Sequence, residues 1–318
     1  ALSPYFEDYS LYAANESDMV LIAKKKGQLS LPSPALFSTP TFANDFAEVQ
    51  WFSLADVEAH RVAEKEWLNP FIQMIKAPVN SDFYPYVDQH AVSARFKRED
   101  AFVITSLKDR LAPMPGVYYA YTLPVSENAK PIAFGEREQV MDAQRIARMS
   151  ADNMTLEGLS EKSQQLVADI FAGADCRQPR AKNEWRDKTV KLMALVLPRV
   201  EKSAASPLLS HLERVACPVV DEQDKTAEWL ALFRAISDRN LSSQRHYAEF
   251  ILENDASVKD LSINYILEAA MVANLGLGEN DNVLELFKLS QKPSATMRVL
   301  AARAEEQKIG ALKNMPNT

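Results

Sequence analysis

A helical periodicity fills the second half of the chain and restricts that half to an all-helical architecture. From about residue 136 onward, apolar side chains recur three or four positions apart, and short breaks separate the runs. The predicted helices cover residues 185–200, 226–237, 242–253, 261–275, 282–289 and 294–307, after two apolar repeats at 140–149 and 156–171. Because short breaks join antiparallel neighbours, we expect a stack of helical hairpins.

The spacing of these helices resembles that of a repeat protein. Successive helices begin about 20 residues apart, so one helix pair occupies about 35 to 40 residues, near the period of tetratricopeptide-like repeats. The Trp-Leu-Gly-Tyr signature of that repeat is absent, which leaves both a degenerate solenoid and an irregular bundle open. The large apolar residues expected in the core are Trp229, Phe233, Tyr247, Phe250 and Tyr265.

The beginning of the chain has strand character instead. Residues 5–24 form two short runs rich in Tyr, Leu, Val and Ile, with the turn-prone segment 15–17 between them, and this pattern predicts a strand pair. Three lysines and Gly27 follow, and we interpret them as a solvated strand end beside a glycine turn.

A helix is predicted after these strands. Ser53 is a suitable N-cap and Asp56 lies three residues later, which approximates a capping box. We expect the helix to run toward Trp67, with His60 on its charged, exposed face.

Residues 126–135 are polar and rich in turn formers, and we place a domain boundary there. The predicted domains are therefore an α/β region at 1–125 and an α-helical hairpin, TPR-like region at 136–318. The fold class expected for the whole chain is α+β, mostly α.

Composition limits the function classes. The chain has 318 residues, 47% of them hydrophobic and 25% charged, with a net charge of −7 and scattered basic residues, so we expect no nucleic-acid footprint. No run approaches about 18 apolar residues, the length that spans a membrane. The chain starts at Ala1 without a signal pattern, and we expect a soluble cytoplasmic piece of a longer protein, associated with a membrane only through an upstream region.

Motifs for cofactors and metals are missing from the sequence. There is no G-x-G-x-x-G or Walker-type loop, no HExxH and no GxSxG, and the four histidines are scattered. Cys176 and Cys217 lack CxxC spacing and fit a reduced compartment, with a single disulfide as the open alternative. We therefore expect this chain to hold no cofactor and no metal.

One segment stands out as a built polar loop. Residues 78–88 combine amides, carboxylates, aromatics and two prolines, a composition that stiffens a loop without secondary structure. Asp82 and Asp88 flank Tyr84 and Tyr86, and an amine can pair with the acid while the ring face adds a cation–π contact. The alternative is structural: Asn80 and Asp82 cap backbone amides, and the tyrosines anchor the loop.

The same segment resembles a known family. The stretch that closes the synthase domain in bacterial spermidine synthase-like proteins, which are often fused behind a multi-pass, transporter-like membrane region, is similar to Asn80-Ser81-Asp82-x-x-Pro85-x-Val87-Asp88 followed by Ala91-x-x-Ala94-Arg95-Phe96. Residues 8–13 and 18–23 are similar to the last two strands of that family's nucleotide-binding sheet. The resemblance covers about the first hundred residues, and Phe83 stands where the family commonly has a second acidic residue.

The resemblance implies a fold and a reaction. Residues 1–125 would be the C-terminal part of a Rossmann-like synthase domain, and the parent reaction would be aminopropyl transfer from decarboxylated S-adenosylmethionine to a diamine such as putrescine. The implied amine-binding residues are Asn80, Asp82, Tyr84, Tyr86 and Asp88. The family holds its cosubstrate on a Gly-rich loop and uses a catalytic Asp on earlier strands, so we expect this chain alone to be inactive.

Two other classes remain open from the sequence. The helical hairpins present a surface for a protein partner, and the chain would then be a non-enzymatic interaction module. The third class is an S-adenosylmethionine-dependent methyltransferase-like parent, which shares the same final strands. A Gly-rich strand-to-helix turn upstream favours the nucleotide-binding enzymes over the module.

Overall fold

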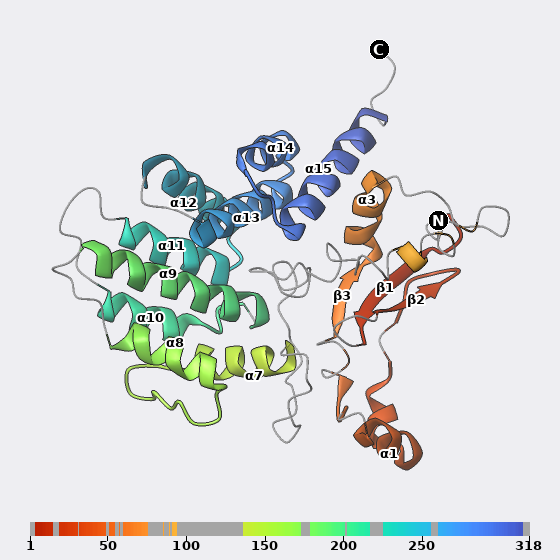
Figure 1. Cartoon of the computed structure of the whole chain (residues 1–318), viewed down its shortest axis with the longest axis horizontal. Helices are drawn as coiled ribbons and strands as arrows, with labels where there is room; N and C mark the ends of the chain where they lie inside the picture. The colour runs from red at the N-terminus through yellow and green to blue at the C-terminus, as the bar shows by residue number, and fades with distance from the viewer. Residues whose placement is uncertain are drawn as a thin grey trace.

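A computed structural model shows a small sheet joined to a large helical region (Figure 1). It describes residues 4–14, 19–30, 32–48, 51–54, 57, 60–75, 85, 89, 91–93, 136–172, 179–200, 202–216, 225–255 and 260–313. Helices dominate these residues, and the predicted α+β, mostly α class is confirmed.

The sheet has three antiparallel strands. These are β1 (Asp8–Ala13), β2 (Met19–Lys24) and β3 (Arg61–Glu64), in the order β2-β1-β3. Leu11 lies opposite Leu21 on β2 and Ala63 on β3. The predicted strand pair at the start of the chain is confirmed, and the end of β2 is a lysine-rich turn in which Gly27 adopts φ +78°.

The predicted helix from Ser53 toward Trp67 is wrong over its second half. Leu54 and Val57 are helical, but the chain then forms β3 before α3 (Lys65–Ile75) begins. Capping residues are a local signal, whereas β3 forms because β1 offers an unpaired edge that sequence spacing does not reveal. The strand buries Val62 and Ala63 almost completely.

His60 is buried, not exposed as predicted. Only 8% of its surface is accessible, and its ring lies 5.4 Å from the ring of Trp51. Trp51 in turn belongs to a row of aromatic rings that continues through Phe46 to Phe37, on α1 (Pro40–Glu48) and η1 (Pro34–Ser38). His60 is therefore part of the packing between this row and the sheet.

The regular elements described in the second region are all helices, and the one β-bridge among its described residues joins Ser150 and Asn153. Its elements are α7 (Glu136–Ala147), α8 (Glu161–Phe171), α9 (Pro179–Val196), η2 (Leu197–Arg199), α10 (Ser206–Val215), α11 (Thr226–Ser237), α12 (Leu241–Asn254), α13 (Asp260–Gly276), α14 (Asn280–Leu289) and α15 (Ala295–Lys313). Every helix predicted for this second region is present. Helices α1 and α10 were not predicted, and each carries a proline at or near its first position, which reads locally as a break.

Helix α13 forms the centre of this region. Most of its described side chains are buried, among them Ile266, Ala270 and Met271, because α9, α12, α14 and α15 all pack against it (Figure 1). A helix that is apolar on every side must be covered on every side. Of the predicted core residues, Trp229, Phe233 and Tyr265 are buried, and Tyr247 and Phe250 are half-buried.

A buried charged cluster connects three helices. Arg186 on α9 donates a hydrogen bond from Nη1 to Oδ2 of Asp255, at 3.1 Å, where α12 ends. The indole Nε1 of Trp229 on α11 donates to the same oxygen at 3.2 Å, and the Arg186 guanidinium lies 5.7 Å from the Trp229 ring. One carboxylate therefore orients a guanidinium and an indole from two other helices.

Removal of this carboxylate should strongly destabilise the helical region. Asp255→Ala removes the closer of the two carboxylates beside the buried Arg186 guanidinium and the acceptor of the Trp229 indole, and we expect a loss of about 3 to 5 kcal/mol in the free energy of unfolding. Urea denaturation measures this loss. Glu285→Ala, which removes an exposed ion pair with Lys288, is the control and should change the free energy by less than about 0.5 kcal/mol. Equal effects of the two substitutions would contradict the importance of the cluster.

A second prediction concerns His211 on α10, whose ring lies 4.4 Å from that of Phe171 on α8. Burial lowers the pKa of His211, and the charge of Arg214 lowers it further, while Asp152 opposes the shift. The unfolded chain therefore binds the proton more readily than the folded chain. Stability should be unaffected above the unfolded pKa of about 6.5 and should fall as the pH drops below it toward the lower folded pKa.

Thermal melting at about pH 7.5 and about pH 5 tests this dependence. His211→Phe should reduce the difference between the two melting temperatures by about 1 to 3 °C. His246→Phe is the matched control, because His246 is exposed on α12. A pH dependence that stays the same in His211→Phe would show that this imidazole is not responsible.

Candidate functional site

The predicted amine-binding loop lies almost entirely outside the described residues. Asn80, Asp82, Tyr84, Tyr86 and Asp88 belong to that part of the chain, and only Pro85 between them is described. Helix α3 ends at Ile75, a few residues before this loop. Among the described residues, the candidate site is therefore the cavity at the N-terminal end of α3.

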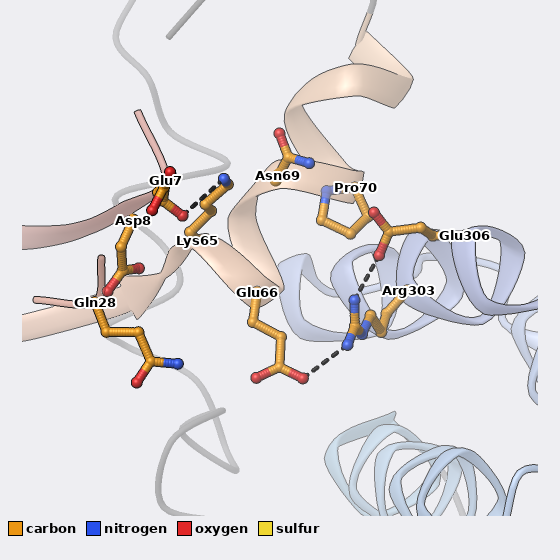
Figure 2. A pocket seen from close by; sticks show the side chains of 9 residues that line it. All are labelled: Glu7, Asp8, Gln28, Lys65, Glu66, Asn69, Pro70, Arg303 and Glu306. Carbon is orange, nitrogen blue, oxygen red and sulfur yellow. Dashed lines mark hydrogen bonds and ion pairs between the residues drawn. The ribbon is translucent and has the colours of Figure 1, made fainter. Parts of the chain in front are cut away.

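This cavity has a volume of about 320 Å³ and opens between the sheet and α15 (Figure 2). Its walls come from the start of β1, the turn after β2, the first turns of α3 and the middle of α15. Almost all of its side chains are polar: Glu7, Asp8, Gln28, Lys65, Glu66, Asn69, Arg303 and Glu306, with Pro70 as the apolar member.

Two carboxylates at the start of β1 fasten the turn that follows β2. Oε2 of Glu7 accepts a hydrogen bond from the backbone N–H of Gly27 at 2.5 Å, and Oδ2 of Asp8 accepts one from that of Leu29 at 2.6 Å. Asp8 also accepts from the Tyr9 N–H through Oδ1, at 2.9 Å. The turn therefore forms a fixed wall of the cavity.

Lys65, the first residue of α3, extends the same wall beside Glu7. Its ammonium donates to the backbone carbonyl oxygen of Glu7 at 3.0 Å (Figure 2). It also donates to the carbonyl oxygen of Phe6 at 3.0 Å and lies 6.0 Å from the centre of the Tyr9 ring. These contacts hold the ammonium at the rim of the sheet.

Arg303 on α15 joins the distant part of the chain to this site. One guanidinium nitrogen lies 2.7 Å from Oε1 of Glu66 on α3, and the other lies 2.5 Å from Oε2 of Glu306 on α15 (Figure 2). Glu66 and Glu306 are partly exposed, so solvent screens these pairs. Their main effect is to orient the side chains at the mouth of the cavity.

The charge balance favours a cationic ligand. Four carboxylates face two cationic side chains; Glu7 and Asp8 accept from backbone N–H groups, and Glu66 and Glu306 pair with Arg303, so the excess of negative charge remains after these contacts. None of the lining residues is a Ser, Thr, Cys or His, so the walls supply acceptors but no nucleophile of these types. Within the described residues no group of three or more His, Cys, Asp or Glu side chains is arranged to hold a metal ion.

Sequence reasoning did not identify this cavity. Arg303 and Glu66 are 237 residues apart, and nothing in either local pattern distinguishes them from ordinary surface charges. The signal that was available is the adjacent pair Glu7 and Asp8 beside a strand, because carboxylate oxygens can accept hydrogen bonds from the backbone N–H groups of a turn.

No protein-family model, curated protein or solved structure matches this chain. In the part of the chain that the structure describes, no helix combines the length and the apolar character needed to cross a membrane.

The contact between α3 and α15 can be tested by a double-mutant cycle. Glu66→Ala, Arg303→Ala and the double variant should give a coupling energy of about 0.2 to 1 kcal/mol in urea denaturation, since the pair is partly exposed. The coupling should shrink when the salt concentration rises. Arg298→Ala, an exposed arginine of the same helix, is the control and should show no coupling with Glu66→Ala. A coupling near zero at low salt would mean that the pair does not join the two regions.

Proposed function

We propose that this chain is part of a spermidine synthase-like aminopropyltransferase and contributes to the binding of its diamine substrate. In this proposal the sheet and the 80–88 loop belong to the synthase domain, as the C-terminal part of a Rossmann-like fold, and the helices after residue 136 form a hairpin, repeat-like domain. The observation that carries the proposal is the carboxylate-rich cavity on α3, the helix that leads into the loop.

The chemistry of a diamine supports this reading. Putrescine and spermidine carry ammonium groups at neutral pH, and such groups are recognised by carboxylates and by the faces of aromatic rings. The cavity provides Glu7, Asp8, Glu66 and Glu306, and the loop sequence provides two aspartates interleaved with two tyrosines. The cavity lies at the N-terminal end of α3, and the loop follows the C-terminal end of this helix in the sequence. A negative field around α3 would therefore attract the substrate.

The proposal assigns this chain to the amine side of the reaction. In the family, the amine nitrogen attacks the aminopropyl carbon of decarboxylated S-adenosylmethionine, the bond from that carbon to the sulfonium sulfur breaks, the neutral thioether leaves and the amine loses a proton. The cosubstrate is held by a Gly-rich loop, and the family uses a catalytic Asp. The 318-residue sequence contains no G-x-G-x-x-G loop, so the proposal places cosubstrate binding in sequence other than this one.

Isothermal titration calorimetry with putrescine and spermidine tests amine binding by the chain. Asp82→Asn removes a carboxylate and Tyr84→Ala removes a ring face, and each should weaken binding by about five- to thirtyfold. Glu285→Gln on α14 is the control, since it removes an exposed carboxylate in another part of the chain, and it should leave binding unchanged.

The cavity and the loop can be separated in the same experiment. Loss of binding in Glu66→Gln, with Asp82→Asn unaffected, would assign the amine to the cavity instead of the loop. Absence of binding to a folded chain, verified by its thermal melting, would contradict amine recognition. Aminopropyl transfer itself is tested by adding decarboxylated S-adenosylmethionine to a longer chain that carries the Gly-rich loop, with S-adenosylmethionine beside it for the methyltransferase alternative.

A non-enzymatic interaction module is the second candidate. It is favoured by the consecutive packing of α11, α12, α13, α14 and α15, each against the next, which is the arrangement of helical-hairpin proteins that bind partners (Figure 1). A folded chain that binds neither putrescine nor spermidine would favour this second candidate.

A further inference from the structure

An aromatic surface lies on η1 and α1. We call Phe37, Phe42, Phe46 and Trp51 the aromatic cluster, since their rings contact one another in sequence. Of the described side chains of η1 and α1, none is buried, and Phe42 is 47% exposed. In Figure 1, α1 lies below the sheet, on the side opposite to α15. Exposed apolar side chains that gather in one place mark an interaction surface.

The spacing of the rings fits an extended peptide. The ring centre of Phe46 lies 6.2 Å from that of Phe42 and 6.3 Å from that of Trp51. Alternate side chains of an extended peptide are about 6.6 Å apart and point to the same side, whereas adjacent side chains point to opposite sides. Two alternate side chains of a bound peptide can therefore contact two neighbouring rings of the aromatic cluster.

The charged side chains on α1 are both carboxylates. Asp45 and Glu48 are exposed, and Asp45 follows Phe42 by three residues, which places the two side by side on the helix. In the part of the chain that the structure describes, neither carboxylate forms an ion pair. The sequence contains no Lys or Arg between Lys26 and Arg61, so this segment supplies no cation of its own. The surface therefore combines ring faces with carboxylates that lack a counter-ion.

We propose that the aromatic cluster is a docking surface for an extended segment of a partner protein that carries arginines at alternate positions. A guanidinium is planar and stacks on an aromatic face, where the cation–π attraction favours it. The carboxylates of Asp45 and Glu48 supply the complementary charge beside the rings. This inference does not rest on the proposed function.

Other occupants match the charges of this surface less well. An anionic lipid surface is repelled by Asp45 and Glu48. A second copy of the same surface would bring these carboxylates toward their own equivalents, and like charges oppose that approach. A partner without cations would contact the rings but would gain nothing from the carboxylates.

Trp51 gives a direct measurement of binding. It is half-buried, whereas the other three tryptophans of the chain, Trp67, Trp185 and Trp229, are buried. Acrylamide therefore quenches the fluorescence of Trp51 preferentially. The end-capped peptide Ala-Arg-Ala-Arg-Ala should protect Trp51 from quenching, with a dissociation constant of about 0.1 to 1 mM at low salt.

Two substitutions test the residues that carry the proposal. Phe42→Ala removes an exposed ring, and Asp45→Asn removes a charge while it keeps the shape of the side chain. Each should weaken binding of the peptide by about five- to tenfold. Leu289→Ala, which removes an exposed apolar side chain from α14, and Glu66→Gln, which removes a carboxylate from the cavity, are the controls and should leave binding unchanged.

Two further peptides test the chemistry of the partner. Ala-Arg-Arg-Ala-Ala has the same composition and charge, but its arginines point to opposite sides when the peptide is extended, so it should bind at least about fivefold more weakly. Ala-Leu-Ala-Leu-Ala keeps the spacing without the charge and should not protect Trp51.

Several results would overturn the proposal. The alternating peptide does not protect Trp51 in a chain that thermal melting shows to be folded, or the two arginine peptides bind equally well. Binding that is unchanged in Phe42→Ala and Asp45→Asn would mean diffuse attraction to an acidic chain. Binding that is lost in Glu66→Gln would place the peptide in the cavity, and equal binding of the leucine peptide would assign the surface to a partner without cations.

Discussion

The three-stranded sheet is too small to bury its own apolar side chains, and the arrangement of the molecule follows from how they are covered. Tyr9 and Leu11 on β1 are buried against α3, which contributes Trp67, Leu68 and Phe71. Helix α15 then packs on α3, and a single hydrophobic core runs from the sheet into the helical region (Figure 1). Buried apolar contacts therefore hold the two regions together, and polar contacts surround this junction.

The rim of that junction is where the charged side chains meet. Lys65 at the start of α3 is held by carbonyls of the chain before β1, and Arg303 reaches Glu66 from α15. Partly exposed ion pairs of this kind contribute little stability, and their clearer consequence is a cavity with more carboxylates than cations.

Most helices of the second region were predictable because each carries its apolar stripe in its own sequence. The pattern of residues 226–237 predicts α11, and burial of Trp229 and Phe233 confirms the stripe. Strand β3 was not predictable in this way, because four residues carry too little periodicity and the partner strand lies 50 residues earlier. The cavity was even harder to predict from the sequence, since its walls come from segments near both ends of the chain.

The sequence by itself determined the helical second half, the strand pair at the start, the acidic balance and the resemblance of the 80–88 loop, because these depend on residue type and short spacing. The tertiary structure decided that residues 61–64 pair with β1, that His60 is buried beside Trp51, that Asp255 receives Arg186 and Trp229, and that Arg303 faces Glu66. Such contacts depend on which elements lie side by side after burial, and local spacing carries no information about that choice.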